Sequence, residues 1–277
     1  MHGQSRPSAR ARLSALRLRP RKGLSQSFLE DGGVVADIVR AAELASTTDV
    51  LEVGPGLGVM TQQLARRARR VVAVELDSQL ALALEDEHIS NLTVMNQDVL
   101  TFDPAAYFEA PYTVVANLPY HITSPALRHL LGAGPPFAQR MVVMVQAEVA
   151  ERIAAQPGAM SALAVTIQAQ AGVTRVRRVP AAAFYPRPKV DSAVLMLTPL
   201  NDDARAIPRS DVAAFTTLVQ AGFKQPRKTL VNSLSDGLSL TRTEATRRLT
   251  QAGIEPGVRP QVLAVADWVR LYRLRAA

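Results

Sequence analysis

The sequence contains no cysteine, and this absence excludes several kinds of chemistry at once. Disulfide bonds, thiolate zinc sites, iron–sulfur clusters and cysteine nucleophiles all require a thiol. Long apolar runs are also missing: no stretch approaches the roughly 20 apolar residues that cross a bilayer, and the N-terminus lacks the apolar core of a secretory signal. The four histidines show none of the short spacings typical of metal ligands. We therefore expect a soluble protein without membrane or metal partners.

The chain has 277 residues, of which 48% are hydrophobic, and this is enough for one large and one smaller domain. Its charge is distributed unevenly along the sequence. Residues 1–22 hold seven basic and no acidic residues, 23–204 hold 13 basic and 19 acidic, and 205–277 hold 12 basic and five acidic. Clustered lysine and arginine gain affinity for phosphates by releasing counterions. The pattern favours a catalytic body whose flanks meet a polyanion, with ordinary surface charge as the alternative.

The first 22 residues are rich in arginine and serine, and we expect them to be a disordered basic tail. Such a segment suits contacts with RNA. Because it contains no acidic residue, it also fits a mitochondrial transit peptide. We expect a cytoplasmic protein, with a mitochondrial location as the alternative.

The remaining chain changes its apolar pattern near residue 200. Before that point, segments with helical spacing alternate with short apolar runs, which predicts a parallel α/β sheet wound on both faces over residues 23–200. Beyond it, short amphipathic helices predict a helical domain over 201–277. The expected strands are 49–54, 70–77, 92–100, 112–118, 140–146, 162–172 and 192–200. The expected helices are 34–45, 59–68, 79–87, 124–131, 211–223, 227–234, 242–253 and 262–274.

Three successive strand ends carry residues suited to an adenosine-containing ligand. Gly54, Gly56 and Gly58 follow the first expected strand, and glycine lets the backbone approach a ligand closely. Glu75 follows Gly54 by 21 residues and can accept hydrogen bonds from both hydroxyls of a ribose. Asp98 ends the next strand and can accept one from an adenine amine. These positions leave NAD and S-adenosylmethionine open as ligands.

The sequence Asn-Leu-Pro-Tyr at 117–120 favours S-adenosylmethionine, because it suits an amino group conjugated to an aromatic base. The lone pair of such a nitrogen is delocalised, so the nitrogen is a poor nucleophile. The Asn117 side-chain oxygen and the Leu118 carbonyl can hold its two hydrogens and aim the lone pair at a donor methyl. Pro119 fixes the preceding carbonyl, and Tyr120 offers a stacking face worth roughly 1–3 kcal/mol. A simple X-Pro turn is the structural alternative.

Seven segments together resemble the ribosomal RNA adenine N6-dimethyltransferases of the KsgA type, which act on small-subunit RNA. They are SQSFL (25–29), LEVGPGLG (51–58), VELD (74–77), QDVL (97–100), NLPY (117–120), FYPRPKVDSAV (184–194) and FKQPRKTLVNSL (223–234). The resemblance runs from about residue 22 to the C-terminus. It implies a Rossmann-like class I methyltransferase sheet with a small all-α C-terminal domain. It also implies N6-dimethylation, by S-adenosyl-L-methionine, of two adjacent adenosines near the 3′ end of 16S rRNA, linked to small-subunit biogenesis.

The resemblance further implies roles for individual residues. The cofactor-binding positions are Ser27, Leu29, Gly54, Gly56, Glu75, Asp98 and Asn117. The catalytic positions are Asn117, Leu118, Pro119, Tyr120 and Phe184, of which Phe184 would stack a flipped adenine against Tyr120 or else serve as a core aromatic. The positions facing RNA are Lys224, Arg227 and Lys228, with an ordinary solvated helix end as the alternative. The implied partner is the RNA of an assembling 30S-type subunit, with the protein acting as a monomer.

Three positions depart from the family pattern. Members commonly carry Gly-Gln-Asn where this chain has Ser25, Gln26 and Ser27, and serine reaches less far than asparagine. Direct contact of Ser27 with the cofactor is therefore less secure. His121 stands where asparagine is frequent, and we assign it no catalytic role.

Two other functions remain as alternatives. A relative that dimethylates one adenine of 23S rRNA and confers macrolide resistance typically reads Asn-Ile-Pro-Tyr and carries asparagine in place of Asp191, so Leu118 and Asp191 favour the small-subunit enzyme. A non-catalytic RNA-binding assembly factor predicts decay of the reactive residues, whereas Asn117, Glu75 and Asp98 all remain. Methylation at pyrimidine C5 and radical methylation are excluded because both need cysteine.

Overall fold

The computed structural model describes residues 7–274, which form two compact units. The first takes the described residues up to Ala150 together with Thr174–Thr198, and the second takes Glu151–Val173 and the described residues from Pro199 onward. From the sequence we expected a single boundary near residue 200. The structure instead assigns residues 151–173, which precede that boundary, to the second unit. Within the described residues, no helix is long and apolar enough to cross a membrane.

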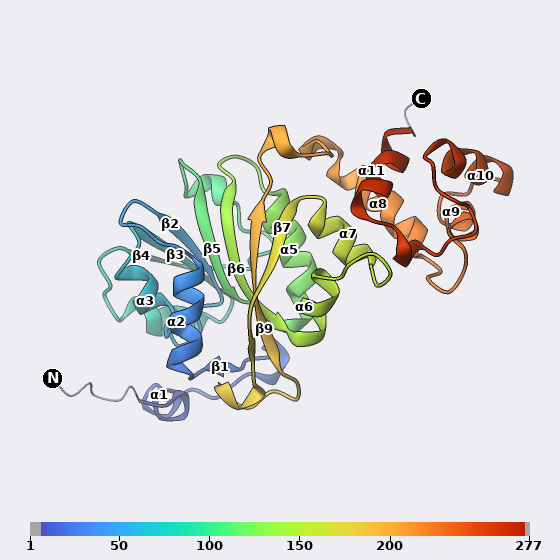
Figure 1. The fold of residues 1–277 in the computed structure, drawn as a ribbon. Coiled ribbons are helices and arrows are strands. Elements are labelled where there is room, and N and C mark those ends of the chain that lie inside the picture. The colour runs from blue at the N-terminus through green and yellow to red at the C-terminus, as the bar shows by residue number, and fades with distance from the viewer. Residues whose placement is uncertain (1–6, 275–277) are drawn as a thin grey trace. The chain divides into compact units, whose positions relative to one another are not determined.

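A mixed sheet forms the centre of the first unit (Figure 1). Its strand order, for the part of the chain described, is β4-β3-β2-β5-β6-β9-β7. The strands are β2 Asp49–Val53, β3 Arg70–Glu75, β4 Leu92–Asn96, β5 Tyr112–Asn117, β6 Ala138–Gln146, β7 Ala171–Val179 and β9 Ser192–Pro199. The chain runs outward from β2 to β4 and then returns to place β5 beside β2, in parallel. The carboxyl ends of β2 and β5 therefore flank a topological switch point, where open α/β sheets bind ligands.

Helices cover the sheet because its strands are apolar on both sides. All residues of β2 are buried, and on one face of the sheet Val50 and Val115 pack with Ile38 and Leu64 of two helices. The helices of this unit are α2 Gly32–Ala41, α3 Thr61–Ala65, α4 Ser78–Glu85, α5 Thr123–Gly132 and α6 Ala147–Ile153, the last of which extends into the second unit. The Rossmann-like α/β class expected from the sequence is confirmed.

Two local expectations were wrong. The sheet is not wholly parallel, because β9 pairs antiparallel with β6. Residues 162–172, expected as a strand, instead form helix α7, Ala162–Gln168, followed by the start of β7. The β-branched residues of this segment favour a strand locally. The helix wins because Ser161 caps it, with its Oγ accepting a hydrogen bond from the Ala164 N–H at 3.1 Å, and because its apolar side joins a helical core.

Part of the segment expected to be disordered over 1–22 is helical. Helix α1, Ala9–Ala15, begins at Ser8, whose Oγ accepts a hydrogen bond from the Ala11 N–H at 3.2 Å. Leu13 is buried in an apolar cluster with Leu57 of the first unit. Composition predicted disorder, but a capped helix with one apolar side is stabilised by packing. Residues 1–6 of the expected tail lie outside the described residues.

The second unit is built from helices around Trp268. Its helices are α7, α8 Val212–Phe223, α9 Leu230–Gly237, α10 Arg242–Gln251 and α11 Val265–Arg273. The Trp268 ring is fully buried and stacks on Phe223, with ring centroids 5.4 Å apart. The Trp268 ring also packs against Gly222, where a Cβ would lie only 2.3 Å from the ring.

We predict that Gly222→Ala destabilises the second unit by about 2–3 kcal/mol, because a fully buried indole has no free space into which it can move. Urea unfolding followed by Trp268 fluorescence measures the change, since the chain has one tryptophan. Gly132→Ala is the matched control, because a Cβ there meets nothing within 4 Å. Equal stability of the two variants would show that the core around Trp268 is loosely packed.

Candidate functional site

A cavity of about 210 Å³ opens at the carboxyl ends of β2, β3 and β5. Every residue predicted to bind cofactor or to take part in catalysis lines it: Ser27, Leu29, Gly54, Gly56, Glu75, Asp98, Asn117, Leu118, Pro119, Tyr120 and Phe184. Segments up to 157 residues apart in sequence therefore meet in one place. Among the described residues, no group of three or more histidine, aspartate or glutamate side chains could hold a metal ion.

The glycine turn after β2 leaves space that larger residues would fill. Gly54, Gly56 and Gly58 have φ values of +68°, +56° and +70°, in the left-handed region that favours glycine. A Cβ on Gly56 would lie 3.1 Å from the ring of Phe28, and one on Gly54 would lie 3.5 Å from the Asn117 carbonyl oxygen. A side chain at either position would be strained by its φ value, and one at Gly56 would also be crowded by Phe28.

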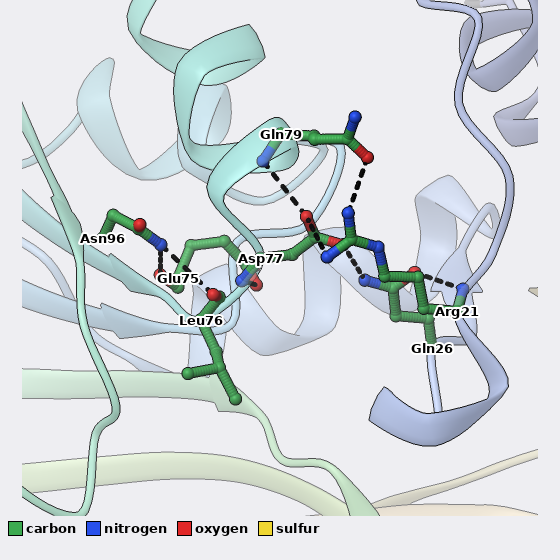
Figure 2. A network of polar contacts seen from close by, with 7 residues as sticks. All are labelled: Arg21, Gln26, Glu75, Leu76, Asp77, Gln79 and Asn96. Carbon is green, nitrogen blue, oxygen red and sulfur yellow. Dashed lines mark hydrogen bonds and ion pairs between the residues drawn. The ribbon is translucent and has the colours of Figure 1, made fainter.

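Two backbone N–H groups fix the position of the Glu75 carboxylate. Its Oε2 accepts a hydrogen bond from the Gly56 N–H at 3.0 Å, and its Oε1 accepts one from the Asp77 N–H at 2.9 Å. Burial raises the pKa of the Glu75 carboxyl, and these two N–H groups oppose that shift by favouring the ionised form. Asn96 fixes the same turn, with its Nδ2 donating to the Glu75 carbonyl at 2.9 Å (Figure 2).

Asp98 lines the cavity just after the end of β4. Its Oδ1 accepts a hydrogen bond from the Leu100 N–H at 2.9 Å, which fixes the carboxylate within its own turn. A carboxylate placed in this way leaves acceptor capacity for a ligand amine. The order of Glu75 and Asp98 on neighbouring strands suits a ribose followed by a base.

The Asn-Leu-Pro-Tyr segment lines the cavity at the end of β5. Asn117 Nδ2 donates to the Ser27 carbonyl at 3.4 Å, which directs the amide toward the N-terminal segment. The Leu118 N–H donates to the Met144 carbonyl at 3.1 Å, so the strand pairing continues one residue further. The Tyr120 hydroxyl and the buried Ser192 hydroxyl lie 2.9 Å apart and fix the direction of the aromatic ring.

Phe184 reaches the cavity through a second, two-stranded sheet. In this sheet β1, Phe28–Leu29, pairs antiparallel with β8, Phe184–Tyr185, and Leu29 lies opposite Phe184. The Phe184 ring is 4% exposed and also belongs to the apolar core around α2. The position therefore suits both roles considered from the sequence, a core aromatic and one side of a clamp.

Sequence reasoning assigned no role to several cavity residues, of which Leu76 is the most informative. It lies between Glu75 and Asp77, it lines the cavity, and it is 53% exposed. An apolar residue directly after a strand-ending carboxylate is suited to contact a base. That spacing was visible in the sequence as VELD.

The residues expected to face RNA belong to the second unit, at the end of α8, and they are not among the residues that line the cavity. Lys224 Nζ forms an ion pair with Asp236 at 3.0 Å, which holds the pKa of that carboxyl below its usual value. Arg227 and Lys228 follow in an exposed turn before α9. The positive charge of Lys224 is therefore partly neutralised within the fold, unlike that of its two neighbours.

Glu52, in the middle of β2, is a buried carboxyl beneath the glycine turn. It is fully buried, its carboxyl oxygens form no hydrogen bond of standard geometry among the described residues, and the Thr61 hydroxyl only partly opposes the effect of burial on its pKa. Burial raises the pKa of Glu52 from 4.5 to about 8. The group therefore stays protonated at neutral pH in the folded chain.

We predict that this carboxyl makes the fold less stable as pH rises. The folded pKa lies above the unfolded one, so stability falls between pH 4.5 and about 8, where only the unfolded chain releases the proton. The loss from pH 5.5 to pH 8 is about 3 kcal/mol. Glu52→Gln should flatten this dependence in urea unfolding measured at both pH values. An unchanged slope in the variant would assign the pH dependence to other groups.

Comparisons with known proteins identify the family to which the chain belongs. The profile of the family described as ribosomal RNA adenine dimethylase matches residues 17–276. A protein of Dehalococcoides mccartyi named ribosomal RNA small subunit methyltransferase A is 41% identical over 273 residues, which cover 95% of this chain and 91% of the relative. The crystal structure of the 23S rRNA methyltransferase ErmE is 30% identical, with a TM-score of 0.66 over 89% of this chain and 98% of that one.

A dimethyladenosine transferase from Plasmodium falciparum shares the fold, with a TM-score of 0.73 over 88% of this chain and 95% of that one at 24% identity. The sequence match extends through both units, from the segment before β1 to the end of α11. It includes every strand end that lines the cavity. The chain belongs to the ribosomal RNA adenine dimethylase family.

Proposed function

We propose that the protein transfers methyl groups from S-adenosylmethionine to the N6 nitrogens of two adjacent adenosines near the 3′ end of small-subunit ribosomal RNA. The observation that carries this proposal is the cavity itself, in which a glycine turn, two strand-end carboxylates and the Asn-Leu-Pro-Tyr segment converge. This combination suits an adenosine-containing donor on one side and an aromatic amine on the other. The proposed roles of the individual residues rest on that arrangement.

The residues of the cavity suit S-adenosylmethionine in size and chemistry. Gly54 and Gly56 would lie against its methionine part, in a turn whose positive φ values favour glycine. Glu75 would accept hydrogen bonds from its ribose, and Asp98 would accept one from its adenine amine. Ser27 and Leu29 would cover it from the N-terminal side. When bound, the sulfonium supplies an electrophilic methyl group, which needs no metal.

The target amine would be held by the end of β5. The Asn117 side-chain oxygen and the Leu118 carbonyl accept its two hydrogens and favour a pyramidal nitrogen. Asn117 Nδ2 already donates to the Ser27 carbonyl, which leaves the amide oxygen to face the substrate. Tyr120 and Phe184 would stack the adenine after it leaves its RNA strand.

The small-subunit substrate is favoured over the large-subunit one. The relative that is 41% identical carries a small-subunit name, whereas the ErmE structure, named for 23S RNA, is 30% identical. Leu118 and Asp191 agree with the small-subunit pattern. Asp191 Oδ1 accepts a hydrogen bond from the Ala181 N–H at 3.0 Å, so it shapes the segment before Phe184.

We further propose that the protein acts as a monomer on an assembling small subunit in the cytoplasm. The relatives named small-subunit methyltransferase A come from bacteria, which favours this location over a mitochondrial one. Unstacking an adenosine costs a few kcal/mol, so RNA already folded within a subunit is a suitable substrate. This step links methylation to ribosome biogenesis.

Transfer of labelled methyl groups from S-adenosylmethionine to purified ribosomal subunits tests the function. Small and large subunits that lack adenine dimethylation are incubated separately, and their RNA is digested to nucleosides. We expect label in N6,N6-dimethyladenosine from the small subunit alone. Label from the large subunit would assign the resistance function, and no label from either would favour an assembly factor without catalysis.

The exposed turn before α9 gives a separate prediction about RNA affinity. We expect Arg227→Ala and Lys228→Ala each to weaken RNA binding and to reduce the slope of log affinity against log salt by about one. Lys224→Ala should change the slope less, because Lys224 is paired with Asp236. Filter binding over a range of salt concentrations measures all three. If the slopes of Arg227→Ala and Lys228→Ala equal that of the exposed control Arg66→Ala, this turn does not contact RNA.

A further inference from the structure

The N-terminal segment is tied to the cofactor cavity by a network of polar contacts centred on Asp77 (Figure 2). Arg21 and Gln26 come from this segment, while Asp77 is the N-cap of α4 and Gln79 lies in the first turn of that helix. Figure 2 shows the two side chains of the segment directed toward the Asp77 carboxylate. More than 50 residues separate the two sides of the network.

Asp77 is the buried centre of these contacts. Its side chain is 4% exposed, and its Oδ1 caps α4 by accepting a hydrogen bond from the Gln79 N–H at 3.1 Å. The same oxygen lies 3.3 Å from Nη1 of Arg21, and Oδ2 accepts a hydrogen bond from Gln26 Nε2 at 2.8 Å. A carboxylate removed from water is costly unless such partners satisfy it. The α4 cap alone uses only part of the hydrogen-bonding capacity of the Asp77 carboxylate. Arg21 and Gln26 supply the remaining partners.

The segment side of the network is also internally ordered. The Arg21 N–H donates to Gln26 Oε1 at 2.8 Å, and Arg21 Nη2 donates to Gln79 Oε1 at 2.7 Å. Ser25, between them, has a φ of +52°, in the left-handed region that favours glycine. A serine persists in this conformation only where its surroundings hold it. The contacts of Arg21 before Ser25, and those of Gln26 and β1 after it, provide that restraint.

The network lies next to the residues that would bind the cofactor. The Asp77 N–H donates to Glu75 Oε1, the carboxylate proposed to hold the ribose. On the segment side, residues 24–29, which include Gln26 itself, all line the cavity. Asn117 Nδ2 donates to the carbonyl of Ser27, so this cover is attached at a second point.

We propose that Arg21, Gln26 and Asp77 form a clasp that holds residues 24–29 closed over the cofactor, so that cofactor affinity depends on the clasp and the chemical step does not. The proposal rests on the proposed function, which makes this cavity the S-adenosylmethionine site. Arg21 and Gln26 are positioning residues, because they act through the backbone of the cover.

Cofactor binding to the protein alone tests the clasp. Calorimetry with S-adenosylhomocysteine gives the dissociation constant for wild type and for Arg21→Ala and Gln26→Ala. Each variant removes one contact to a buried carboxylate, and we expect affinity to fall about five- to tenfold. Arg19→Ala is the matched control, since Arg19 is an exposed arginine of the same segment and the variant loses the same charge. We expect it to bind like wild type.

Kinetics separate positioning from a general structural effect. In methyl transfer, Arg21→Ala should raise KM for S-adenosylmethionine by the same factor and leave kcat unchanged at saturation. Arg21→Lys keeps the ion pair and should recover most of the affinity. Unchanged binding in both alanine variants, or an equal loss in Arg19→Ala, would overturn the clasp. Absence of binding by the wild-type protein would instead count against the proposed function.

Discussion

Replacing Asn117 with alanine is expected to lower the rate of methyl transfer by about a thousandfold. The side-chain oxygen is proposed to hold one hydrogen of the target amine, and its neighbour Leu118 offers only one further acceptor. Without it the amine remains planar and conjugated. Cofactor binding should change far less, because the amide of Asn117 makes one long hydrogen bond to Ser27 in the closed site. Single-turnover transfer to small subunits measures the effect.

Asn201→Ala is the matched control for this experiment. Asn201 is exposed in the second unit, and its side chain caps no helix. We expect its rate and its melting temperature to equal those of wild type. An Asn117→Ala enzyme with near-normal activity would show that the end of β5 does not activate the amine, and the proposed mechanism would have to be abandoned.

Glu75→Gln is expected to weaken cofactor binding by about a hundredfold, a cost of about 3 kcal/mol. The carboxylate accepts one backbone N–H on each oxygen, from Gly56 and Asp77. Glutamine offers a single acceptor, so one of these N–H groups would face an amide NH₂ and the turn would shift. The ribose hydroxyls would also lose a charged acceptor. Calorimetry with S-adenosylhomocysteine measures the change.

Glu85→Gln serves as the comparison, because Glu85 is an exposed residue at the end of α4. The substitution makes the same chemical change at a distance from the cavity, and we expect unaltered affinity. Similar affinity of the Glu75 and Glu85 variants would mean that Glu75 supports the glycine turn without contacting the cofactor. A raised KM with normal kcat in Glu75→Gln would agree with a binding role.

Much of the cavity could be predicted from the sequence because its residues follow strands. Gly54, Glu75, Asp98 and Asn117 each stand at or just after the end of an apolar run. Parallel strands bring their carboxyl ends to one edge, so local patterns were sufficient to place these four residues together. The structure adds the reversal of strand order at β2 and β5, which locates the site on that edge.

Other features depend on contacts that local patterns do not encode. Helix α7 was mistaken for a strand because its β-branched residues favour extended backbone, while its cap at Ser161 and its place in a helical core decide the outcome. Helix α1 was mistaken for disorder because its composition is basic, while Leu13 is stabilised by a cluster that includes Leu57.

Long-range polar contacts were also invisible in the sequence. Asp77 was quoted only as part of a motif, and its partners Arg21 and Gln26 lie more than 50 residues away. Glu52 resembles any strand residue until its burial without hydrogen bonds of standard geometry is known. At Glu52 the fold tolerates the cost of burying a carboxyl group without such hydrogen bonds, beside the cavity.

The central claim is that this cavity dimethylates adjacent adenosines of small-subunit RNA. The most direct measurement is mass spectrometry of the 3′-terminal ribonuclease fragment of that RNA, after unmethylated small subunits react with the purified protein and S-adenosylmethionine. The account predicts two neighbouring adenosines that each gain two methyl groups, and no gain with Asn117→Ala. A fragment of unchanged mass with wild-type protein, or methyl groups on another base, would contradict it.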